Sequence, residues 1–191
     1  SPGDFLFGGP ITVIGAGDGA GGTALSGRVR TPPSGTTLRG LQISGAAQGV
    51  SLEGGGVTLI DCTVRDNQIG VLNVGGTVEM QRCNVVSNTS GGINNVGGAI
   101  TLRNSTVEQN TATQGAGISS ESAPGAGLYA SLNLYDSKVR FNTATTSGGG
   151  IASGGNNAQV NFYGTTVVCG NSPANSQCTG FSNSACTANC S

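Results

Sequence analysis

Histidine and tryptophan are absent from the 191 residues, and charged side chains make up only 9% of them. Without histidine no Ser-His-Asp triad can form, and a structural zinc site would need four cysteines. An average soluble domain has about 25% charged residues, so this scarcity predicts a surface of Thr, Ser, Asn and Gly. The sequence lacks the side chains of several common catalytic centres.

Long apolar runs and basic clusters are also missing. The longest apolar runs, such as 5–7, fall far short of the ~20 residues of a membrane-spanning helix, so no membrane span is expected. The net charge is -1 and the eight Lys and Arg are scattered singly, which argues against nucleic acid as a partner. The chain starts with Ser and shows no signal segment, so we expect a processed or trimmed N-terminus.

The chain is rich in glycine, with 35 residues, and it repeats itself about every 21 residues. Two successive units read VTLIDCTVRDNQIGVLNVGGT and VEMQRCNVVSNTSGGINNVGGA. Units begin at Thr36, Val57, Val78, Ile100, Ser131 and Gln159. Together with a partial opening unit, they make about seven turns of a repeat architecture.

Aligned units place apolar residues in three columns. These are Leu38, Leu59, Met80, Leu102, Leu134 and Phe162; Ile43, Val64, Val85, Val107 and Val139; and Val50, Val71, Ile93, Ile118 and Ile151. Each unit therefore has three short pieces of period 2 between Gly or Asn corners, with no helical spacing. The pattern predicts an all-β parallel β-helix at 11–171, between an N-terminal extension at 1–10 and a Cys-rich tail at 172–191.

A fourth column contains Asn67, Asn88, Asn110 and Asn142, each three residues after the second apolar column. Asn tolerates the left-handed conformation that a corner needs, and stacked Asn side chains can hydrogen-bond along a ladder. The glycines that follow permit backbone angles that larger residues resist. We interpret these Asn residues as structural rather than catalytic.

The units resemble the repeats of right-handed parallel β-helix proteins of the pectate-lyase-like superfamily. The late units, with QNTATQGAGI and FNTATTSGGGI, are similar to the repeats of polymorphic outer membrane proteins, which pair an F-x-x-N-like motif with a G-G-A-I-like motif. Here Phe141 directly precedes Asn142, and other units have Asp, Ser or Gln in place of the Phe. The resemblance spans most of 11–171 and implies a secreted or surface-displayed solenoid.

Enzymes of this superfamily use neighbouring carboxylates as acid and base or as calcium ligands. The best acidic cluster in this chain is Asp61, Asp66 and Glu79, on turns ~4.8 Å apart. Asp61 and Asp66 lie on different faces of their turn, and Arg82 on the next turn predicts a surface ion pair with Asp61. We therefore assign no catalytic residue, metal or cofactor.

The six cysteines are Cys62, Cys83, Cys169, Cys178, Cys186 and Cys190. The first two share a column at a spacing within the disulfide range, although directly stacked Cβ atoms lie somewhat far apart, so a bridge and two packed thiols remain alternatives. The last four lie in a low-complexity tail that cannot form a core, so two disulfides are expected there. This cysteine usage indicates an extracellular or cell-surface location.

N-x-S/T sequons occur at Asn88, Asn104 and Asn189. Asn104 lies in an outward column and is the expected acceptor in a eukaryotic source. Asn88 belongs to the buried ladder, and Asn189 lies beside Cys190.

Three classes of function remain open. The first is a structural protein that assembles end to end, because the open end of a β-helix exposes unpaired strand edges and head-to-tail contacts build filaments. Phe5, Leu6, Phe7 and Phe181 are the candidate contacts with a second copy of the chain, although the first three can instead fold over their own first turn. The alternatives are an adhesin or glycan-binding module, and a polysaccharide lyase or hydrolase.

Overall fold

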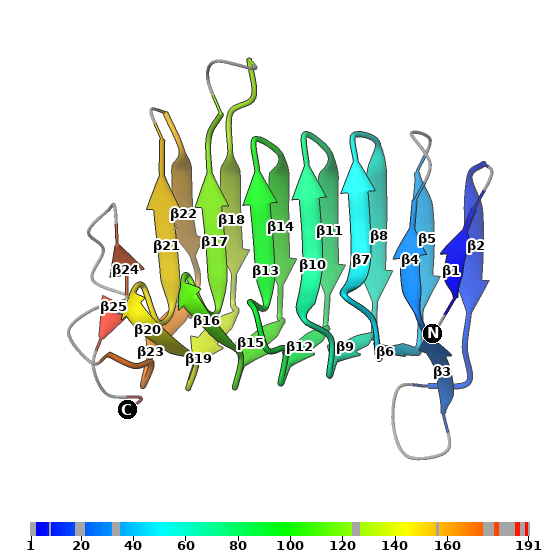
Figure 1. Ribbon diagram of the computed structural model, residues 1–191, viewed down its shortest axis with the longest axis horizontal. Helices are drawn as coiled ribbons and strands as arrows, with labels where there is room; N and C mark the ends of the chain where they lie inside the picture. Colours follow the sequence, from blue (N-terminus) through cyan, green and yellow to red (C-terminus); the bar gives the residue numbers. More distant parts are fainter. Residues whose placement is uncertain are drawn as a thin grey trace.

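The computed structural model describes residues 3–7, 9–17, 22–31, 35–123, 127–155, 157–173, 178–179, 186–187 and 190. The chain winds into a solenoid in which each turn, or rung, adds one strand to each of three sheets (Figure 1). All strand pairs in these sheets are parallel. The predicted all-β parallel β-helix of about seven turns is therefore confirmed. Among the described residues there is no helix that could cross a membrane.

We call the three long sheets A, B and C. Sheet A contains β1 Asp4–Leu6, β4 Arg28–Arg30, β7 Gln48–Glu53, β10 Ile69–Val74, β13 Ile93–Val96, β17 Ile118–Glu121, β21 Ile151–Gly154 and β24 Cys178–Thr179. Sheet B contains β2 Ile11–Ile14, β5 Thr36–Arg39, β8 Gly56–Ile60, β11 Thr77–Gln81, β14 Ala99–Arg103, β18 Ser131–Tyr135 and β22 Gln159–Tyr163.

Sheet C contains β3 Thr23–Ser26, β6 Leu41–Ser44, β9 Thr63–Arg65, β12 Asn84–Val86, β15 Thr106–Glu108, β19 Lys138–Arg140, β23 Val167–Cys169 and β25 Cys186–Thr187. A small fourth sheet, D, pairs β16 Thr111–Gln114 with β20 Thr143–Ser147. In Figure 1, sheets A and B stand as two tall layers and sheet C closes their base.

The core lies between the three sheets and consists of the predicted apolar columns. Leu59, Val64 and Val71 come from the three strands of one rung, and each is fully buried. Each pairs in register with its counterpart on the next rung, as Leu59 does with Met80. Because burial of one such side chain contributes about 1.5–3 kcal/mol, every rung adds a similar increment of stability.

The structure corrects the predicted backbone conformation of the Asn corners. The left-handed backbone expected at the Asn column lies one residue earlier, at Asp66, Ser87, Gln109 and Phe141, with φ between 54° and 57°. These preceding residues make the turn and leave the Asn side chain free to point inward. The corner between sheets B and C uses the same conformation at Asp61, Arg82, Asn104 and Asp136.

Both ends of the chain contribute strands to the solenoid. β1 pairs with β4 so that Phe5 stacks on Val29, and Phe5 and Phe7 pack against the core. Of the two alternatives for these phenylalanines, folding back over their own first turn is the one observed. Leu6 points outward and is 71% exposed. At the other end, β24 and β25 extend sheets A and C, while Phe181 lies outside the described residues.

Candidate functional site

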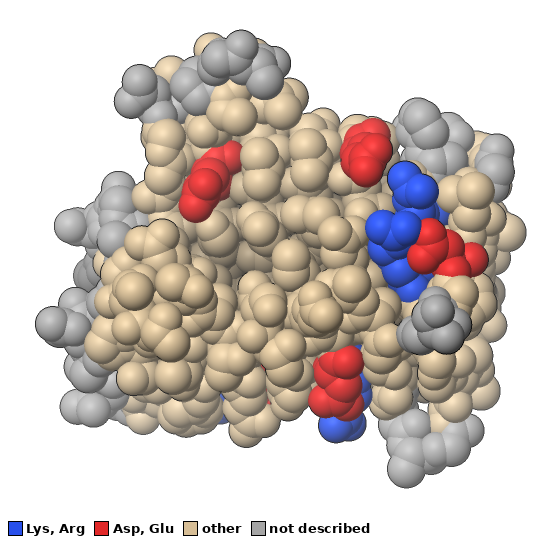
Figure 2. All heavy atoms as spheres, viewed as in Figure 1, with Lys and Arg blue, Asp and Glu red and all other residues tan. Residues whose placement is uncertain are grey.

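A groove lies along the corner between sheets C and A, and we call it the corner groove. It consists of two adjoining pockets of about 440 and 420 Å³ that share Thr89. The first lies between Thr89 and Ser90 on one side and β16 on the other, and the second is lined by 45–47 and 66–68. Figure 2 shows this face of the molecule, with the charged side chains near its margins.

One wall of the corner groove is the ridge formed by β16 and β20. These strands repeat the sequence Thr-Ala-Thr, and Thr111 pairs with Thr143. The hydroxyl of Thr146 donates to the carbonyl oxygen of Thr113 at 2.7 Å, and the Gln114 amide donates to the Ser147 hydroxyl at 3.1 Å. β-Branched threonine favours the extended backbone of such a ridge.

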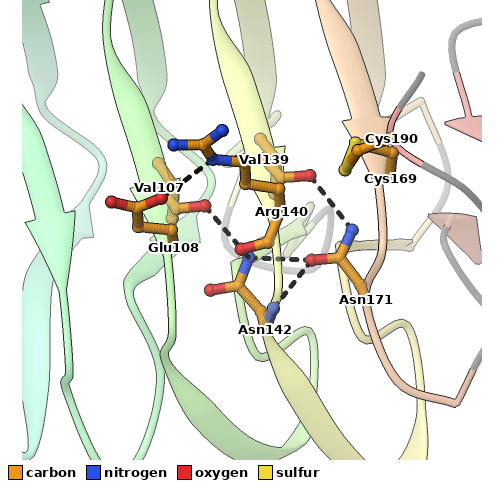
Figure 3. The surroundings of a disulfide bond; sticks show 8 residues. All are labelled: Val107, Glu108, Val139, Arg140, Asn142, Cys169, Asn171 and Cys190. Carbon is orange, nitrogen blue, oxygen red and sulfur yellow. Dashed lines mark hydrogen bonds and ion pairs between the residues drawn. A yellow bond between two sulfur atoms is a disulfide. The ribbon is translucent and has the colours of Figure 1, made fainter.

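A ladder of asparagines runs beneath the corner groove. Each side-chain amide donates to the Oδ1 atom of the next Asn, over distances of 2.9–3.2 Å. The members are Asn67, Asn88, Asn110, Asn142 and, unanticipated from the sequence, Asn171. Oδ1 also accepts the preceding Asn's backbone N–H, so these buried groups satisfy one another. Figure 3 shows the last link, from Asn142 to Asn171.

Of the glycines between the Asn column and the third apolar column, Gly91, Gly115 and Gly148 have positive φ, as predicted. The glycine directly before the third apolar column is needed for another reason. Gly70 and Gly92 do not have positive φ. A Cβ atom on Gly70 would lie 2.5 Å from the Gly92 carbonyl oxygen, and one on Gly92 would lie 2.6 Å from that of Gly117. Successive rungs approach too closely beside the ladder for any side chain, which is why glycine recurs there.

A second polar ladder was missed by the sequence analysis. Asn73 donates through Nδ2 to Asn95 Oδ1 at 2.9 Å, and Asn95 donates to the hydroxyl of Ser120 at 3.2 Å. All three side chains are fully buried behind sheet A. The signal was the shared Asn-Val-Gly-Gly of two successive units, which places Asn73 and Asn95 in one column.

The acidic residues Asp61, Asp66 and Glu79, which the sequence placed on different faces, form no common site in the structure. Asp61 is held by Arg82 at 2.6 Å, Asp66 by Arg65 at 2.7 Å, and Glu79 lies 3.5 Å from Arg103. The hydrogen bond from Arg82 lowers the pKa of Asp61 below its usual value, so this carboxylate is a poor proton donor near neutral pH. The described residues contain no group of three side chains arranged to ligate a metal.

An aromatic stack lies on the outer face of sheet B. The rings of Tyr135 and Tyr163 are parallel within 8°, with centroids 4.3 Å apart, and the guanidinium of Arg103 lies 4.1 Å from the centroid of Tyr135. Tyr135 therefore has a partner on each face of its ring. Stacking of this kind stabilises neighbouring rungs and leaves Tyr135 no free face for a ligand.

The column of Cys62 and Cys83 contains buried thiols, so the packed-thiol alternative is the one observed. Each sulfur donates to a carbonyl oxygen two residues earlier, at 3.3 Å. The hydrogen bond with the Cys62 thiol, together with burial, raises the pKa of Cys83 and keeps it protonated.

The C-terminal tail is linked to the solenoid by a disulfide between Cys169 of β23 and Cys190, with Cα atoms 5.1 Å apart (Figure 3). Cys178 is also disulfide-bonded. The side chain of Cys186 lies outside the described residues, so the predicted pairing of all four tail cysteines is described only in part.

The three sequons have different surroundings. Asn104 is exposed at a corner, whereas Asn88 is only 1% exposed and bonded within the ladder. A glycan at Asn88 would require the ladder to open. Asn189 lies outside the described residues.

No protein-family model, curated protein or solved structure matches the chain. The resemblance to pectate-lyase-like and polymorphic outer membrane protein repeats therefore gains support only at the level of the parallel β-helix itself.

Proposed function

We propose that the protein is an extracellular or cell-surface structural β-helix that assembles end to end through its first rung. The observation that carries this proposal is the location of exposed apolar side chains. Of the six large ones among the described residues, Leu6, Ile11 and Ile14 lie in β1 and β2, and they are 71%, 44% and 72% exposed.

Strand edges at this end support the same function. β1, β2 and β3 are the terminal strands of sheets A, B and C, and no described strand lies beyond them. Edges of this kind recruit further strands. Adjacent apolar side chains would add the burial that makes such pairing stable.

The columns of the solenoid favour a head-to-tail arrangement. Phe5 belongs to the column that passes through Val29 and Ile151 and ends at Cys178 of β24. A second copy placed beyond β24 with its β1 parallel would continue this column. Because the contact is heterologous, it repeats along the axis and builds a filament rather than a closed dimer.

The extracellular or cell-surface location that we propose is supported by the disulfide of the C-terminal tail and by the uncharged surface. Disulfides persist in oxidising compartments, and the Cys169–Cys190 bond anchors the tail to β23. A surface of uncharged Thr, Ser and Asn suits a structural element exposed to solvent. Asp61, Asp66 and Glu79 each have a separate Arg partner, so the role that we propose is not enzymatic.

The test is a pair of charged substitutions on the first rung, Leu6→Asp with Ile14→Asp. Both side chains are mostly exposed, so the fold should persist, whereas Asp at Phe5 or Phe7 would disrupt the core. Each lost contact is worth about 1.5–3 kcal/mol, so association should weaken about 100-fold or more. Sedimentation velocity and negative-stain microscopy would measure this.

Tyr129→Asp is the matched control, because Tyr129 is 55% exposed but lies in the connection between sheets A and B. This variant should assemble like the wild type. A wild-type chain that stays monomeric at high concentration would refute the proposal, as would assembly that Leu6→Asp with Ile14→Asp leaves unchanged.

A further inference from the structure

The corner that follows the Asn ladder changes length abruptly between successive rungs. Between the ladder Asn and sheet A it comprises residues 89–92 in one rung, 111–117 in the next and 143–150 in the one after. The two longer corners project and pair with each other as β16 and β20. The four-residue corner at 89–92 contributes no strand, so sheet D stops at β16 on that side.

β16 is attached to the shorter corner only at its ends. At its start, the backbone N–H of Thr111 donates to the Asn88 carbonyl oxygen at 2.9 Å, and the Thr111 hydroxyl donates to that of Thr89 at 3.2 Å. Just beyond its end, the N–H of Gly92 donates to the Ala116 carbonyl oxygen at 2.9 Å. Between these two anchors the backbone arches away from Ser90.

The 440 Å³ pocket of the corner groove lies under this arch. It is bordered by Thr89 and Ser90 below, by all four residues of β16 above, and by Thr145 of β20. It therefore lies where a longer corner on the shorter rung would have placed another strand. An edge strand is a template for an added chain, whose backbone supplies the hydrogen bonds.

The chemistry of the lining selects the kind of chain. Hydroxyl, methyl and amide groups line the pocket, and no charged or aromatic side chain does. A charged ligand would lose its hydration there without gaining a counter-charge. A sugar would find no aromatic ring on which to stack. An extended peptide with small uncharged side chains carries no charge that would lose its hydration, and it needs no aromatic ring for stacking.

We propose that the pocket beside β16 binds an extended, uncharged peptide segment, which adds to β16 as a third parallel strand of sheet D. Four residues of the segment match the length of β16. The parallel direction is the one that every strand pair of sheets A to D already uses. This site is independent of the end-to-end assembly, because it lies away from the first rung.

The test uses the acetylated and amidated hexapeptide NTATTS, which copies residues 142–147 and thus β20, the strand with which β16 already pairs. The peptide is titrated into the isotopically labelled full chain. We expect saturable NMR shifts of the amides of 89–90 and 111–114, with a dissociation constant in the millimolar range because few contacts offset the entropy of association. Absence of saturable shifts, or shifts located elsewhere, would overturn the proposal.

Two controls separate strand addition from loose association. A peptide with the same side chains but N-methylated at alternate amides cannot donate the edge hydrogen bonds, and it should lose binding. Ser90→Trp fills the pocket and should weaken binding at least 10-fold, whereas Gln159→Trp, an exposed position on sheet B, should not. Equal binding by the methylated peptide, or by Ser90→Trp, would contradict strand addition.

A neutral glucan hexasaccharide serves as the competing ligand. If the glucan shifts the amides of 111–114 and the peptide does not, the corner groove is a glycan surface and the peptide proposal is wrong. If the peptide alone produces the shifts, the glycan-binding alternative loses this site.

Discussion

At the residue scale, the Asn ladder explains why one side chain recurs at one corner of five successive rungs. An Asn offers one acceptor and two donors on a single short side chain. Asn110, for example, donates to the Val85 carbonyl oxygen and to Asn142, and accepts from both nitrogens of Asn88. No other side chain of this length supplies the same set, since Asp has no donor and Ser is too short.

Asn110→Ala should therefore destabilise the protein strongly. The substitution removes the acceptor of the Asn88 backbone N–H and one donor to Val85, both in the interior. Because each buried polar group left without a partner costs about 1–3 kcal/mol, we expect a loss of about 2 kcal/mol or more in the free energy of unfolding. Denaturant titration followed by circular dichroism would measure it.

Asn94→Ala provides the comparison, because Asn94 projects from the outer side of β13 and is only half-buried. A change within about 0.5 kcal/mol is expected there. If the two variants lost equal stability, the ladder would have no special role.

Only part of the Asn ladder could be predicted from the sequence. The column of four Asn residues was visible because each Asn follows the second apolar column by the same three residues. The backbone conformation of the corner could not be predicted, because Asn itself favours the left-handed region. Only the packing of the structure shows that the Asn side chain is needed inside. Asn171 was missed because the last unit is divergent, and the Asn73 ladder because its third member is a serine.

At the scale of the element, the glycine directly before the third apolar column acts through the space that it leaves. Strands of neighbouring rungs converge beside the ladder, so the carbonyl oxygen of one rung occupies the position that a Cβ atom on the previous rung would need. This contact recurs at Gly49, Gly70, Gly92 and Gly117. A glycine there sets the separation of two rungs rather than the direction of the chain.

Gly92→Ala and Gly56→Ala should consequently differ in their effects on the stability of the fold. A methyl group on Gly92 would overlap the backbone of Gly117, and such overpacking costs about 1–3 kcal/mol. On Gly56, which also lacks a positive φ, the nearest atom would lie 3.6 Å away. Alanine there should be neutral or stabilising by about 0.4–1 kcal/mol, because it restricts the unfolded chain. Thermal unfolding of both variants tests this, and equal melting temperatures would contradict it.

The strands themselves were predictable from the sequence, and the corner groove was not. Period-2 alternation with a fixed repeat determines which residues face the core, so all three apolar columns could be read directly. The groove depends on how far two longer corners project and on which of them pair. Both β16 and the corner at 89–92 are polar and glycine-flanked in sequence, and only their relative lengths and hydrogen bonds distinguish them.

At the scale of the whole molecule, the solenoid is a chain of similar rungs, each stabilised mainly by its neighbours. A change at one end should therefore stay near that end. The C-terminal disulfide joins residues 21 apart in sequence, and removing such a link costs about 3 kcal/mol. We expect this loss of stability to be confined to the last rungs rather than shared by the whole protein.

Replacing Cys169 and Cys190 together by Ala should increase amide hydrogen exchange in β22 and β23 while leaving β8 to β15 protected. Exchange followed by mass spectrometry resolves the two regions, and wild-type protein treated with a reductant is the control for the substitutions themselves. A uniform increase along the chain would show that the rungs unfold as one cooperative unit.

The hydrogen bonds that link successive members of the two buried ladders all run in one direction. From Asn67 to Asn171, and from Asn73 to Ser120, each side-chain amide donates toward the C-terminal end. Backbone bonds between rungs run both ways, as Gly40 to Ile60 and Thr77 to Gly55 illustrate, and their dipoles largely cancel. Each Asn of the longer ladder also donates to a carbonyl oxygen of the preceding rung, as Asn110 does to Val85, so only the bonds from one ladder member to the next keep a single direction. The two ends of the rod are therefore different, and a second copy in line could continue this sequence of bonds only if it pointed the same way.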